Sequence, residues 1–371
     1  MVDYAKYGIR PVINASATLT KLGGSLMPAP VLDAMRGAAG AFLDLPEAHK
    51  SIAERLAEIT RNEAAYISSG AAAGISLTVA TCIVGSEPDT RMLFPQLEGY
   101  TRKEVVIFAG QRNGYDYACR ETGAIVVESG PTEADLRSAI GPNTACVLFF
   151  GGENWAAAAP PLERVVEIAH ELGTPVIVDA AAQIPPISNL WYYTKVAGAD
   201  CAIFSGGKGL RGPQSSGLVV GRQWIIDGCH NHGSPNQAFG RPMKVGKEEM
   251  FGLLAAVEWS LEQDEPALLQ RYEDWVQLWN EGFSGFPGVT AERIFPSEAG
   301  QPMPRTQLTI GTASGWTRDA LVDALWEGSP RIAVAALGDD RIALNPQTVM
   351  VGEEVVVRDT LRALLASRAA K

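Results

Sequence analysis

The sequence lacks the features that mark several broad classes of protein. Its 371 residues include only five cysteines, none in a CxxC pair and none beside histidines at metal-ligand spacing. An odd, scattered set of cysteines excludes a disulfide framework and is typical of a reducing cytoplasm. The chain does not open on the basic and apolar segments of a secretion signal, and no apolar run approaches the roughly 20 residues that span a bilayer. We therefore expect a soluble, cytoplasmic protein that makes no use of a membrane.

Positive charge is also scarce. The chain has 31 lysines and arginines against 42 aspartates and glutamates, which gives a formal charge of −11. Because nucleic acids and anionic membranes attract basic surfaces, this balance argues against either as a partner. Low-complexity tracts and internal repeats are absent, and a hydrophobic fraction of 46% is typical of a globular enzyme. The expected partner is a small molecule.

The four histidines form no metal-binding pattern. His230 and His232 stand close together in DGCHNHG, but no further cluster of cysteine, histidine or carboxylate accompanies them, so we expect no metal. His170 falls in a predicted helix and is expected to be structural. His49 follows a helix-like segment and is a candidate for the mouth of a substrate site.

Short apolar runs, alternating with helical patterns, predict an α/β fold. The runs lack polar alternation, which is typical of strands buried on both faces of a parallel sheet; they cover residues 105–108, 124–127, 145–150, 176–178, 201–204 and 217–220. A parallel sheet needs helical crossovers, and helical periodicity fits residues 31–43, 51–60, 71–82, 132–140 and 162–172.

We divide the chain into an N-terminal arm (1–45), a large α/β domain (46–265) and a smaller α+β C-terminal domain (266–371) that the arm partly completes. One long helical stretch, from residue 248 to about residue 282, leads into the last part. Beyond it we predict strands at 308–310, 332–335, 342–344 and 355–357, and helices at 318–326 and 358–366.

An aspartate and a lysine follow two of the predicted strands. Asp179 ends the strand in PVIVDAAAQ, and Lys208 stands in the glycine-rich loop SGGKG after the next strand. Open α/β sheets bind ligands at the carboxyl ends of their strands, and 208 − 179 = 29 residues leave room for one crossover. Taken one at a time, each residue has an alternative structural interpretation: Lys208 as a solvated lysine in a loop, and Asp179 as an aspartate that caps a turn.

Together, the two residues favour pyridoxal phosphate. The lysine would carry the cofactor as a Schiff base, and the flanking glycines would let a flat ligand approach closely. The carboxylate would form a charged hydrogen bond to the pyridine nitrogen, which keeps the ring an electron sink.

A third segment fits the cofactor's phosphate. In AYISSGAAAG, a predicted strand or turn is followed by Ser68, Ser69 and Gly70, and then by a helix of small residues that include Ala71 and Ala72. Backbone N–H groups at a helix start bind phosphate, and small residues let the backbone come close; Ser205 could add a hydroxyl. An N-capped structural helix is the alternative interpretation. The GxxxxGK[ST] and GxGxxG motifs are missing from any suitable context, which disfavours a nucleotide-dependent enzyme.

The order SSGAAAG, VDAAAQ and SGGKGLRGP resembles the fold type I pyridoxal-phosphate enzymes of the selenocysteine-synthase-like group. Within that group the chain is most similar to the D-glucosaminate-6-phosphate ammonia-lyase-like branch. RPVINASATLTKLGG near the start and FGRPMKVGKEEMFGLLAAVE at 239–258 carry the same resemblance, which covers most of residues 8–260 and is looser in the last third.

The resemblance implies a large domain with a mainly parallel sheet flanked by helices, a smaller α+β domain, and pyridoxal 5'-phosphate as cofactor. Lys208 matches the Schiff-base lysine and Asp179 the pyridine partner; Gln183 matches a residue near the ring's 3-oxygen. Ser69, Gly70, Ala71 and Ser205 match the phosphate region. Members are usually dimers or larger with interfacial sites, so Lys244 or Lys247 could reach a neighbouring site.

The chain departs from its relatives after the predicted strand at 105–108. Related sequences often carry a histidine there that stacks on the cofactor ring, whereas this chain has Gln111 in AGQRNGYDYA. Either Tyr115 replaces the stacking side chain or Gln111 covers the ring without aromatic overlap.

The substrate carboxylate should meet an arginine, whose planar fork matches it in two places. The candidates are Arg305, Arg10, Arg112 and Arg331, and we favour Arg305 because it begins a predicted strand of the C-terminal domain. Asn154 and Trp155 follow a core strand and are candidates for the same crevice, although core packing suits the tryptophan equally well.

We therefore expect a lyase. The substrate amine would displace Lys208, the freed amine would remove the α-proton, and loss of a group from Cβ would give a 2-keto acid and ammonia. Racemisation, transamination and aldol cleavage stay open as alternatives. A non-catalytic binding or scaffold protein on the same fold is disfavoured by the presence of both Lys208 and Asp179, and selenium transfer onto tRNA by the acidic charge.

Overall fold

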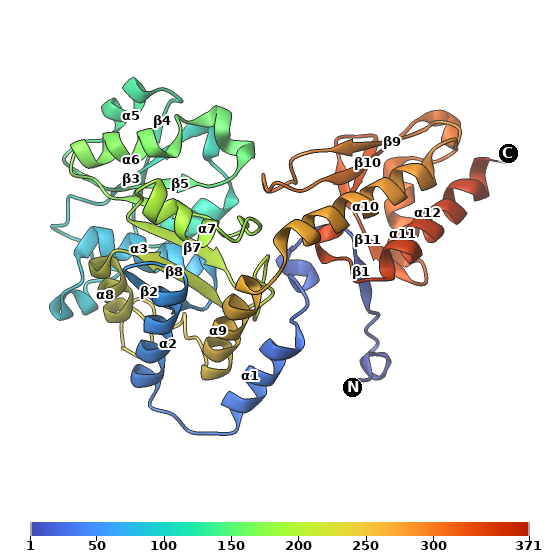
Figure 1. Cartoon of the computed structure of the whole chain (residues 1–371). Helices are drawn as coiled ribbons and strands as arrows, with labels where there is room; N and C mark the ends of the chain where they lie inside the picture. The colour runs from blue at the N-terminus through green and yellow to red at the C-terminus, as the bar shows by residue number, and fades with distance from the viewer. Residues whose placement is uncertain (1, 370–371) are drawn as a thin grey trace. The chain divides into compact units, whose positions relative to one another are not determined.

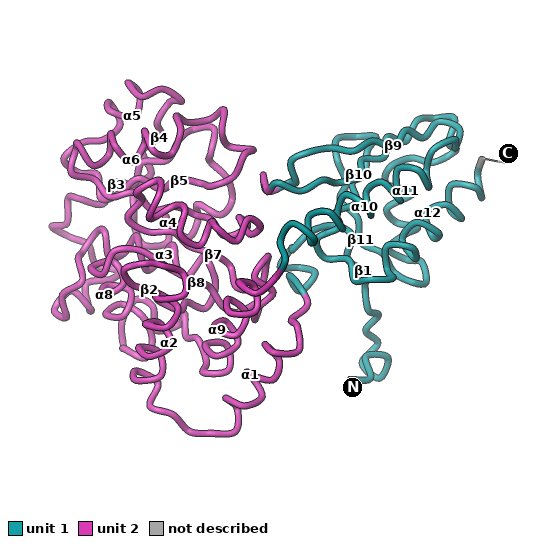
Figure 2. Tube along the Cα trace, viewed as in Figure 1, with its two compact units in different colours: residues 1–25, 264–298, 302–371 teal, residues 26–263, 299–301 magenta. Residues whose placement is uncertain are grey.

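The computed structural model describes residues 2–369. They form two compact units: unit 1 comprises residues 2–25, 264–298 and 302–369, and unit 2 comprises residues 26–263 and 299–301 (Figure 2). The segment that the sequence suggested as one arm, residues 1–45, is thus shared, because its first 25 residues belong to unit 1 and the rest to unit 2.

Unit 2 is built on a seven-stranded sheet in the order β2-β8-β7-β6-β5-β3-β4 (Figure 1). Its strands are β2 (Ala64–Ser68), β3 (Glu104–Phe108), β4 (Ile125–Ser129), β5 (Thr144–Phe150), β6 (Val176–Asp179), β7 (Cys201–Ser205) and β8 (Gly217–Gly221). β8 is antiparallel to both of its neighbours, and the remaining pairs are parallel. The predicted α/β class, with a mainly parallel sheet, is confirmed.

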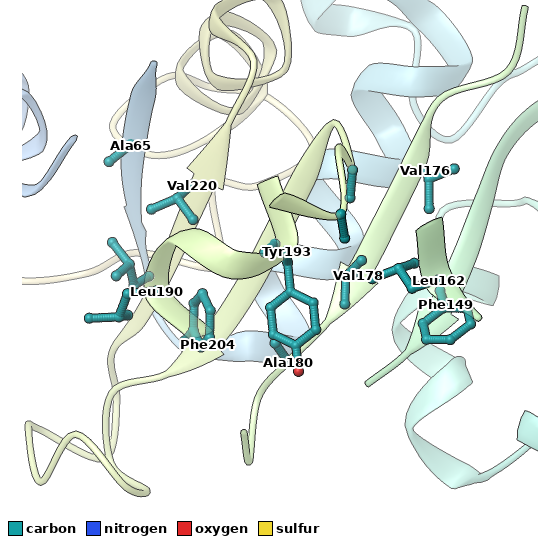
Figure 3. Close-up of a cluster of buried hydrophobic side chains, with 14 of the residues drawn as sticks. Ala65, Phe149, Leu162, Val176, Val178, Ala180, Leu190, Tyr193, Phe204 and Val220 are labelled. Carbon is teal, nitrogen blue, oxygen red and sulfur yellow. The ribbon is translucent and has the colours of Figure 1, made fainter. Parts of the chain in front are cut away.

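Helices cover both faces of this sheet, which explains why its strands are apolar without alternation. The helices are α1 (Ala29–Ala39), α2 (Leu45–Ile59), α3 (Ala71–Val84), α4 (Tyr117–Arg120), α5 (Glu133–Ala139), α6 (Leu162–Glu171), α7 (Asn189–Trp191), α8 (Gln223–His232) and α9 (Lys247–Leu261). Successive strand residues point to opposite faces, so Val176 and Val178 belong to one core and Ile177 to the other. Figure 3 shows part of the first core, which includes Val178, Tyr193 and Phe204; the rings of Tyr193 and Phe204 lie 6.2 Å apart.

Unit 1 contains a four-stranded antiparallel sheet in the order β12-β13-β10-β9 and a parallel pair of β1 with β11. The strands are β1 (Val12–Asn14), β9 (Val289–Ile294), β10 (Arg305–Ile310), β11 (Arg331–Ala333), β12 (Ala335–Leu337) and β13 (Arg341–Leu344). The helices are α10 (Glu265–Phe283), α11 (Arg318–Glu327) and α12 (Glu353–Ala369). The N-terminal strand β1 therefore completes the unit that is otherwise made by the last third of the chain.

Two sequence predictions about the part of the chain after residue 247 are wrong. Residues 355–357 lie within α12 and form no strand. Their core-facing member, Val357, is fully buried together with Leu361 and Leu365, and this spacing of four residues follows a helix rather than a strand. The single helix from 248 to about 282 is two helices, because Asp264 caps α10 by accepting the backbone N–H of Ala267 at 3.0 Å.

Across residues 2–369, no helix combines the length and the apolar character that crossing a bilayer requires.

Candidate active site

The carboxyl ends of several strands of unit 2 meet along one edge of its sheet. Register pairs Phe150 with Asp179, Asp179 with Ile203, and Gly217 with both Ser205 and Ser68. Because β2, β5, β6 and β7 run in the same direction, the loops after these strands open on this edge. The edge thus brings together the segments that carry Asp179, Ser205, Ser69 and Lys208.

Asp179 ends β6 and is 9% exposed. Its Oδ1 accepts the backbone N–H of Ala181 at 2.9 Å, and its carbonyl accepts the N–H of Gly151 at 2.9 Å. Burial raises the pKa of the Asp179 carboxyl, and the backbone hydrogen bond and the nearby Lys208 ammonium oppose that rise. This carboxylate is rigidly held and electrostatically coupled to the lysine.

Lys208 follows β7 and is partly exposed. Its Nζ lies 5.7 Å from the ring centroid of Tyr115, a side chain that is 68% exposed. Tyr115 belongs to a 3-10 helix (Gly114–Asp116) whose start is fixed by Asn113, which accepts the Tyr115 N–H at 2.8 Å. An aromatic face therefore stands next to the lysine amine, as the stacking role proposed for Tyr115 requires.

The glycines around Lys208 are required by packing within the protein, whereas the sequence had suggested that they let a ligand approach closely. A Cβ on Gly206 would collide with Ser216 Oγ, one on Gly207 with Gln214 Cα, and one on Gly209 with the carbonyl of Ile184. Packing of the loop against its own protein thus demands glycine at all three positions.

The loop between β2 and α3 has the geometry of an anion cradle. Gly70 is the N-cap of α3 with φ 145°, and no side chain caps the first-turn N–H groups. Ser68 Oγ donates to the carbonyl of Gly70 at 2.8 Å, which fixes the turn. A Cβ at Gly217 would lie 2.5 Å from Ser68 Oγ and 2.6 Å from the Gly70 carbonyl carbon, so glycine is required there as well. Ser69, Gly70 and Ala71 are partly exposed and Ala72 is exposed.

Gln111 lies in a 3-10 helix (Ala109–Gln111) directly after β3 and is fully buried. Its Oε1 accepts the backbone N–H of Phe150 at 2.9 Å, whereas its Nε2 has no hydrogen-bond partner among the described residues. A buried amide donor left unpaired costs about 1–3 kcal/mol, so Gln111 is suited to a group that the protein itself does not supply.

Gln183 is engaged with a segment that sequence analysis missed. Its Nε2 donates to the carbonyl of Ala299 at 2.8 Å, and Gln301 Nε2 donates to the carbonyl of Ile184 at 2.6 Å. The N–H of Glu153 donates to the carbonyl of Gly300 at 3.4 Å. Residues 299–301 therefore belong to unit 2 although the chain on either side belongs to unit 1. No local sequence pattern signals this contact.

Asn154 is exposed in a 3-10 helix (Glu153–Ala158), and the neighbouring Trp155 ring lies 6.4 Å from that of Phe150. Trp155 thus packs against the core, which favours the structural interpretation. Lys244 is exposed, and Lys247 donates from Nζ to the carbonyl of Ala38 at 2.7 Å and pairs with Glu248.

Among the four arginine candidates, Arg305 differs from the others. It is 8% exposed on β10 of unit 1, and its Nε and Nη1 have no hydrogen-bond partner among residues 2–369. Glu298 Oε2 lies 3.6 Å from Nη1, and burial lowers the pKa of the guanidinium while Glu298 opposes that shift.

The other three arginines also form ion pairs with carboxylates, and among residues 2–369 none of them has a buried nitrogen without a hydrogen-bond partner. Arg112 pairs with Asp116 at 2.6 Å and with Glu128, and Arg10 and Arg331 pair with Glu327 at 3.4 and 3.6 Å. Arg112 is therefore poorly suited to a substrate carboxylate.

His49 does not join this group of residues. It is 4% exposed on α2, where its Nε2 lies 2.9 Å from the carbonyl of Ile67 and its ring packs on Tyr66 and His230. None of these contacts is with Lys208 or Asp179. The prediction that His49 stands at the mouth of the substrate site therefore lacks support from its position, because its neighbours line a separate cavity.

Comparison with known proteins gives consistent results. The family model described as Aminotransferase class-V matches residues 44–232. The chain is 31% identical to a 5'-C-glycyluridine monooxygenase-decarboxylase of a Streptomyces species, over 96% of this chain and 90% of that protein. It is 30% identical to the D-glucosaminate-6-phosphate ammonia lyase of Salmonella typhimurium, over 97% of this chain and 96% of that protein.

A solved structure of a D-glucosaminate-6-phosphate ammonia-lyase superposes with a TM-score of 0.82 at 30% identity, covering 100% of this chain and 99% of that one. An L-seryl-tRNA(Sec) selenium transferase of Serratia proteamaculans is 24% identical over 91% of this chain and 80% of its own length. The predicted resemblance to the selenocysteine-synthase-like group and its ammonia-lyase branch is confirmed.

Proposed function

The chain belongs to the aminotransferase class-V family, and from that premise we propose that it is a pyridoxal-phosphate-dependent lyase. The fold is that of fold type I enzymes, and the family and the ammonia-lyase relatives depend on this cofactor. The proposed reaction is β-elimination from an amino acid or amino sugar acid, which yields a 2-keto acid and ammonia.

The residues of unit 2 fit the cofactor. The uncapped N-terminus of α3 offers N–H groups and a positive dipole end for the phosphate, with the Ser69 and Ser205 hydroxyls as further donors. The unpaired Nε2 of buried Gln111 is a polar group that lacks a partner among the described residues, and the buried Asp179 carboxylate can accept a further hydrogen bond besides that of Ala181. When bound, pyridoxal phosphate supplies a protonated ring that withdraws electrons from the substrate's α-carbon.

The chain's own groups have separate tasks in this proposal. Asp179 holds a negative charge where the pyridine nitrogen would lie and so keeps that nitrogen protonated. Lys208 would hold the cofactor covalently through Nζ, and its free amine would accept the α-proton of the substrate. Tyr115 covers the region beside the amine. Gln183 is held by residue 299 and positions the loop after β6.

The substrate carboxylate is assigned to Arg305. Two of its buried nitrogens lack hydrogen-bond partners among the described residues, which makes it the candidate with unfilled donors. An amino sugar acid is the favoured substrate class, because the ammonia-lyase relative acts on D-glucosaminate 6-phosphate by its name. Asn154 is exposed in the 3-10 helix that follows β5, and it is a candidate to bind the substrate's hydroxyl groups.

The observation that carries the proposal is the position of buried Asp179 at the end of β6 and of Lys208 shortly after the neighbouring strand β7, at the same edge of the sheet. The test is an absorbance spectrum of protein reconstituted with pyridoxal phosphate. Wild type should show a band at about 410–430 nm that Lys208→Ala lacks, because a lysine-bound cofactor absorbs there. Lys195→Ala, which removes an exposed lysine, should keep the band. A wild type without the band would overturn the proposal.

Decarboxylation is a second candidate, because the chain is as similar to a monooxygenase-decarboxylase as to the ammonia lyase. The two reactions differ in their products. Elimination releases ammonia and a 2-keto acid without consuming O2, whereas an oxidative decarboxylation releases CO2 and consumes O2. Product analysis with an amino sugar acid in a closed oxygen-electrode cell separates them, and also detects racemised, transaminated or cleaved products.

The protein is further proposed to act in the cytoplasm as a homodimer or larger homo-oligomer. Its five cysteines are free thiols in the structure, which suits a reducing compartment. Residues 26–43 carry several large apolar side chains in water, including Phe42, which is entirely exposed. A partner subunit would remove such side chains from water.

A further inference from the structure

The turn that carries Lys208 ends in an arginine with an unfavourable backbone conformation. Arg211 has φ 56°, in the left-handed region that favours glycine. Within residues 2–369 only one other residue that is not glycine lies there, Arg61 with φ 58°. Arg61 lies just beyond the end of α2, where this conformation is common, and its N–H donates to the carbonyl of Glu58 at 3.0 Å. Arg211, in contrast, follows the glycine-rich loop after β7 rather than a helix.

The conformation of Arg211 closes the turn on the lysine. Its backbone N–H donates to the carbonyl of Lys208 at 3.0 Å, and the N–H of Gly212, the next residue, donates to the carbonyl of Gly206 at 2.7 Å. Leu210, inside the turn, is fully buried. Both hydrogen bonds depend on the direction that the backbone takes at Arg211, so this residue helps to fix the backbone of Lys208.

The side chain gives the reason for an arginine at this position. Glycine would adopt the same backbone conformation without steric cost, so the turn alone does not require a larger residue. Nε of Arg211 donates to the carbonyl of Leu26 at 2.8 Å, and its guanidinium carbon lies 5.4 Å from the ring centroid of Trp259. Trp259 belongs to α9, and Leu26 is the residue at which the chain enters unit 2. The arginine therefore fastens the lysine's turn to two segments that are distant in the sequence.

The tasks proposed for Lys208 require its amine to stay in one place. The amine is to hold the cofactor and to accept the α-proton, and proton transfer needs the two groups within hydrogen-bond reach. A misplacement of about 1 Å can cost on the order of 100-fold in rate. Because the lysine side chain starts from the backbone of this turn, contacts that fasten the turn also limit the movement of the amine.

We propose that Arg211 is a positioning residue for Lys208. It holds the lysine's turn against Leu26 and Trp259, and it thereby keeps the amine where cofactor attachment and proton transfer take place. The role of Lys208 comes from the proposed function, on which this inference rests, whereas the fastening of the turn rests on contacts within the chain.

Two arginine-to-glycine variants test the proposal. Arg211→Gly keeps both N–H donors of the turn and relieves its backbone conformation, so the fold should be retained, but it removes the side-chain contacts with Leu26 and Trp259. Arg61→Gly is the matched control. It also replaces a left-handed arginine whose guanidinium lies over a tryptophan, Trp191 at 4.2 Å, and it leaves the contacts of the lysine's turn unchanged.

The first readout is amide hydrogen–deuterium exchange, measured by mass spectrometry on the apoprotein and on the holoenzyme. A peptide that covers residues 206–212 should exchange on the order of tenfold faster in Arg211→Gly than in wild type, and at the wild-type rate in Arg61→Gly. Exchange in Arg211→Gly at the wild-type rate overturns the proposal. The apoprotein measurement does not depend on the proposed function. A wild type without the visible band overturns that function, and with it the catalytic purpose of the fastening.

The second readout separates the position of Lys208 from the integrity of the cofactor site. Growth of the visible band after addition of pyridoxal phosphate reports attachment to the lysine, whereas pyridoxamine phosphate lacks the aldehyde and binds without it. Arg211→Gly should form the band on the order of tenfold more slowly and bind pyridoxamine phosphate with wild-type affinity. Arg61→Gly should match wild type in both measurements. Band formation at the wild-type rate in Arg211→Gly, or an equal loss for both compounds, overturns the proposal.

Discussion

At the residue scale, the properties of the candidate site come from burial. Asp179 and Gln111 sit in a protein interior that leaves the first with a carboxyl of raised pKa and the second with an amide donor that no described residue pairs. Buried polar groups without partners are rare in folded proteins because each costs free energy. The unpaired donor of Gln111 and the buried carboxyl of Asp179 are better explained by a bound cofactor than by packing.

Replacing Asp179 by asparagine should reduce turnover with little effect on folding. The new amide keeps an oxygen that can accept the Ala181 N–H, but it no longer provides the negative charge for the ring nitrogen. A hydrogen bond to a charged group contributes about 1.5–3 kcal/mol, so we expect kcat to fall by roughly 10- to 100-fold. Steady-state kinetics and thermal unfolding of the holoenzyme test this. Turnover equal to that of wild type would contradict the role assigned to Asp179.

Two histidines with strongly lowered pKa values, buried His49 and half-buried His230, should make stability depend on pH. Burial lowers the pKa values of His49 and His230 to about 4, whereas an unfolded chain protonates them near 6.5. Below pH 6.5 the unfolded state therefore takes up protons that the folded state refuses, and stability falls until the pH reaches about 4. Between pH 7.5 and pH 5 the loss should be on the order of 2 kcal/mol per histidine.

Urea denaturation of wild type and of the His49→Gln/His230→Gln double variant at pH 7.5 and pH 5 measures this loss. The variant should lose less stability on acidification than wild type. An equal loss in both proteins would assign the pH dependence to other groups.

At the element scale, the phosphate loop depends on close contact of three chain segments. β2 delivers Ser68, α3 begins just beyond Gly70, and β8 begins with Gly217 against both. The loop can present its N–H groups only because no side chain separates these backbones.

Gly217→Ala should weaken cofactor binding without unfolding unit 2. The added methyl would lie 2.6 Å from the Gly70 carbonyl carbon, which belongs to backbone and must move to make room. Overpacking of this kind costs about 1–3 kcal/mol, so we expect roughly 5- to 150-fold weaker affinity for pyridoxal phosphate. The matched control is Gly37→Ala in α1, where a Cβ would meet nothing within 4 Å. Equal cofactor affinities in the two variants, measured by reconstitution titration, would refute the argument.

At the scale of the whole molecule, one chain of 39.5 kDa builds two units that exchange segments. The first 25 residues join the unit made by the C-terminal third, and residues 299–301 join the large unit. Neither unit is a continuous stretch of sequence. Cutting the chain near residue 264 would therefore separate residues that belong together.

The proposed homo-oligomer gives a direct expectation for the mass in solution. Light scattering coupled to size exclusion should report at least twice 39.5 kDa for the holoenzyme at micromolar concentration. The reason is the exposure of Phe42 and its apolar neighbours Leu26, Leu32 and Leu43, which a monomer would leave in water. A mass of one chain at every concentration would contradict the expectation.

The sequence by itself determined the α/β class and the six strand runs, and it predicted that Asp179 and Lys208 follow neighbouring strands of one sheet. These follow from local signals: apolar runs without alternation, helical periodicity between them, and polar residues directly after strands. The same local rules failed at residues 355–357, where three valines suggested a strand. There the burial of Val357 with Leu361 and Leu365 selects a helix, and burial depends on which surface the segment meets.

Only the tertiary structure decided which side chains from distant segments become neighbours, and therefore which polar groups are paired. It left Arg305 with donors that no described residue fills while Arg112 is neutralised by Asp116 and Glu128, and it moved His49 into a cavity with His230. It also showed that the glycines beside Lys208 serve packing against Ser216, Gln214 and Ile184. The physical reason is the same in each case: hydrogen bonding, neutralisation and steric contact depend on neighbours in space, and a single sequence records only neighbours along the chain.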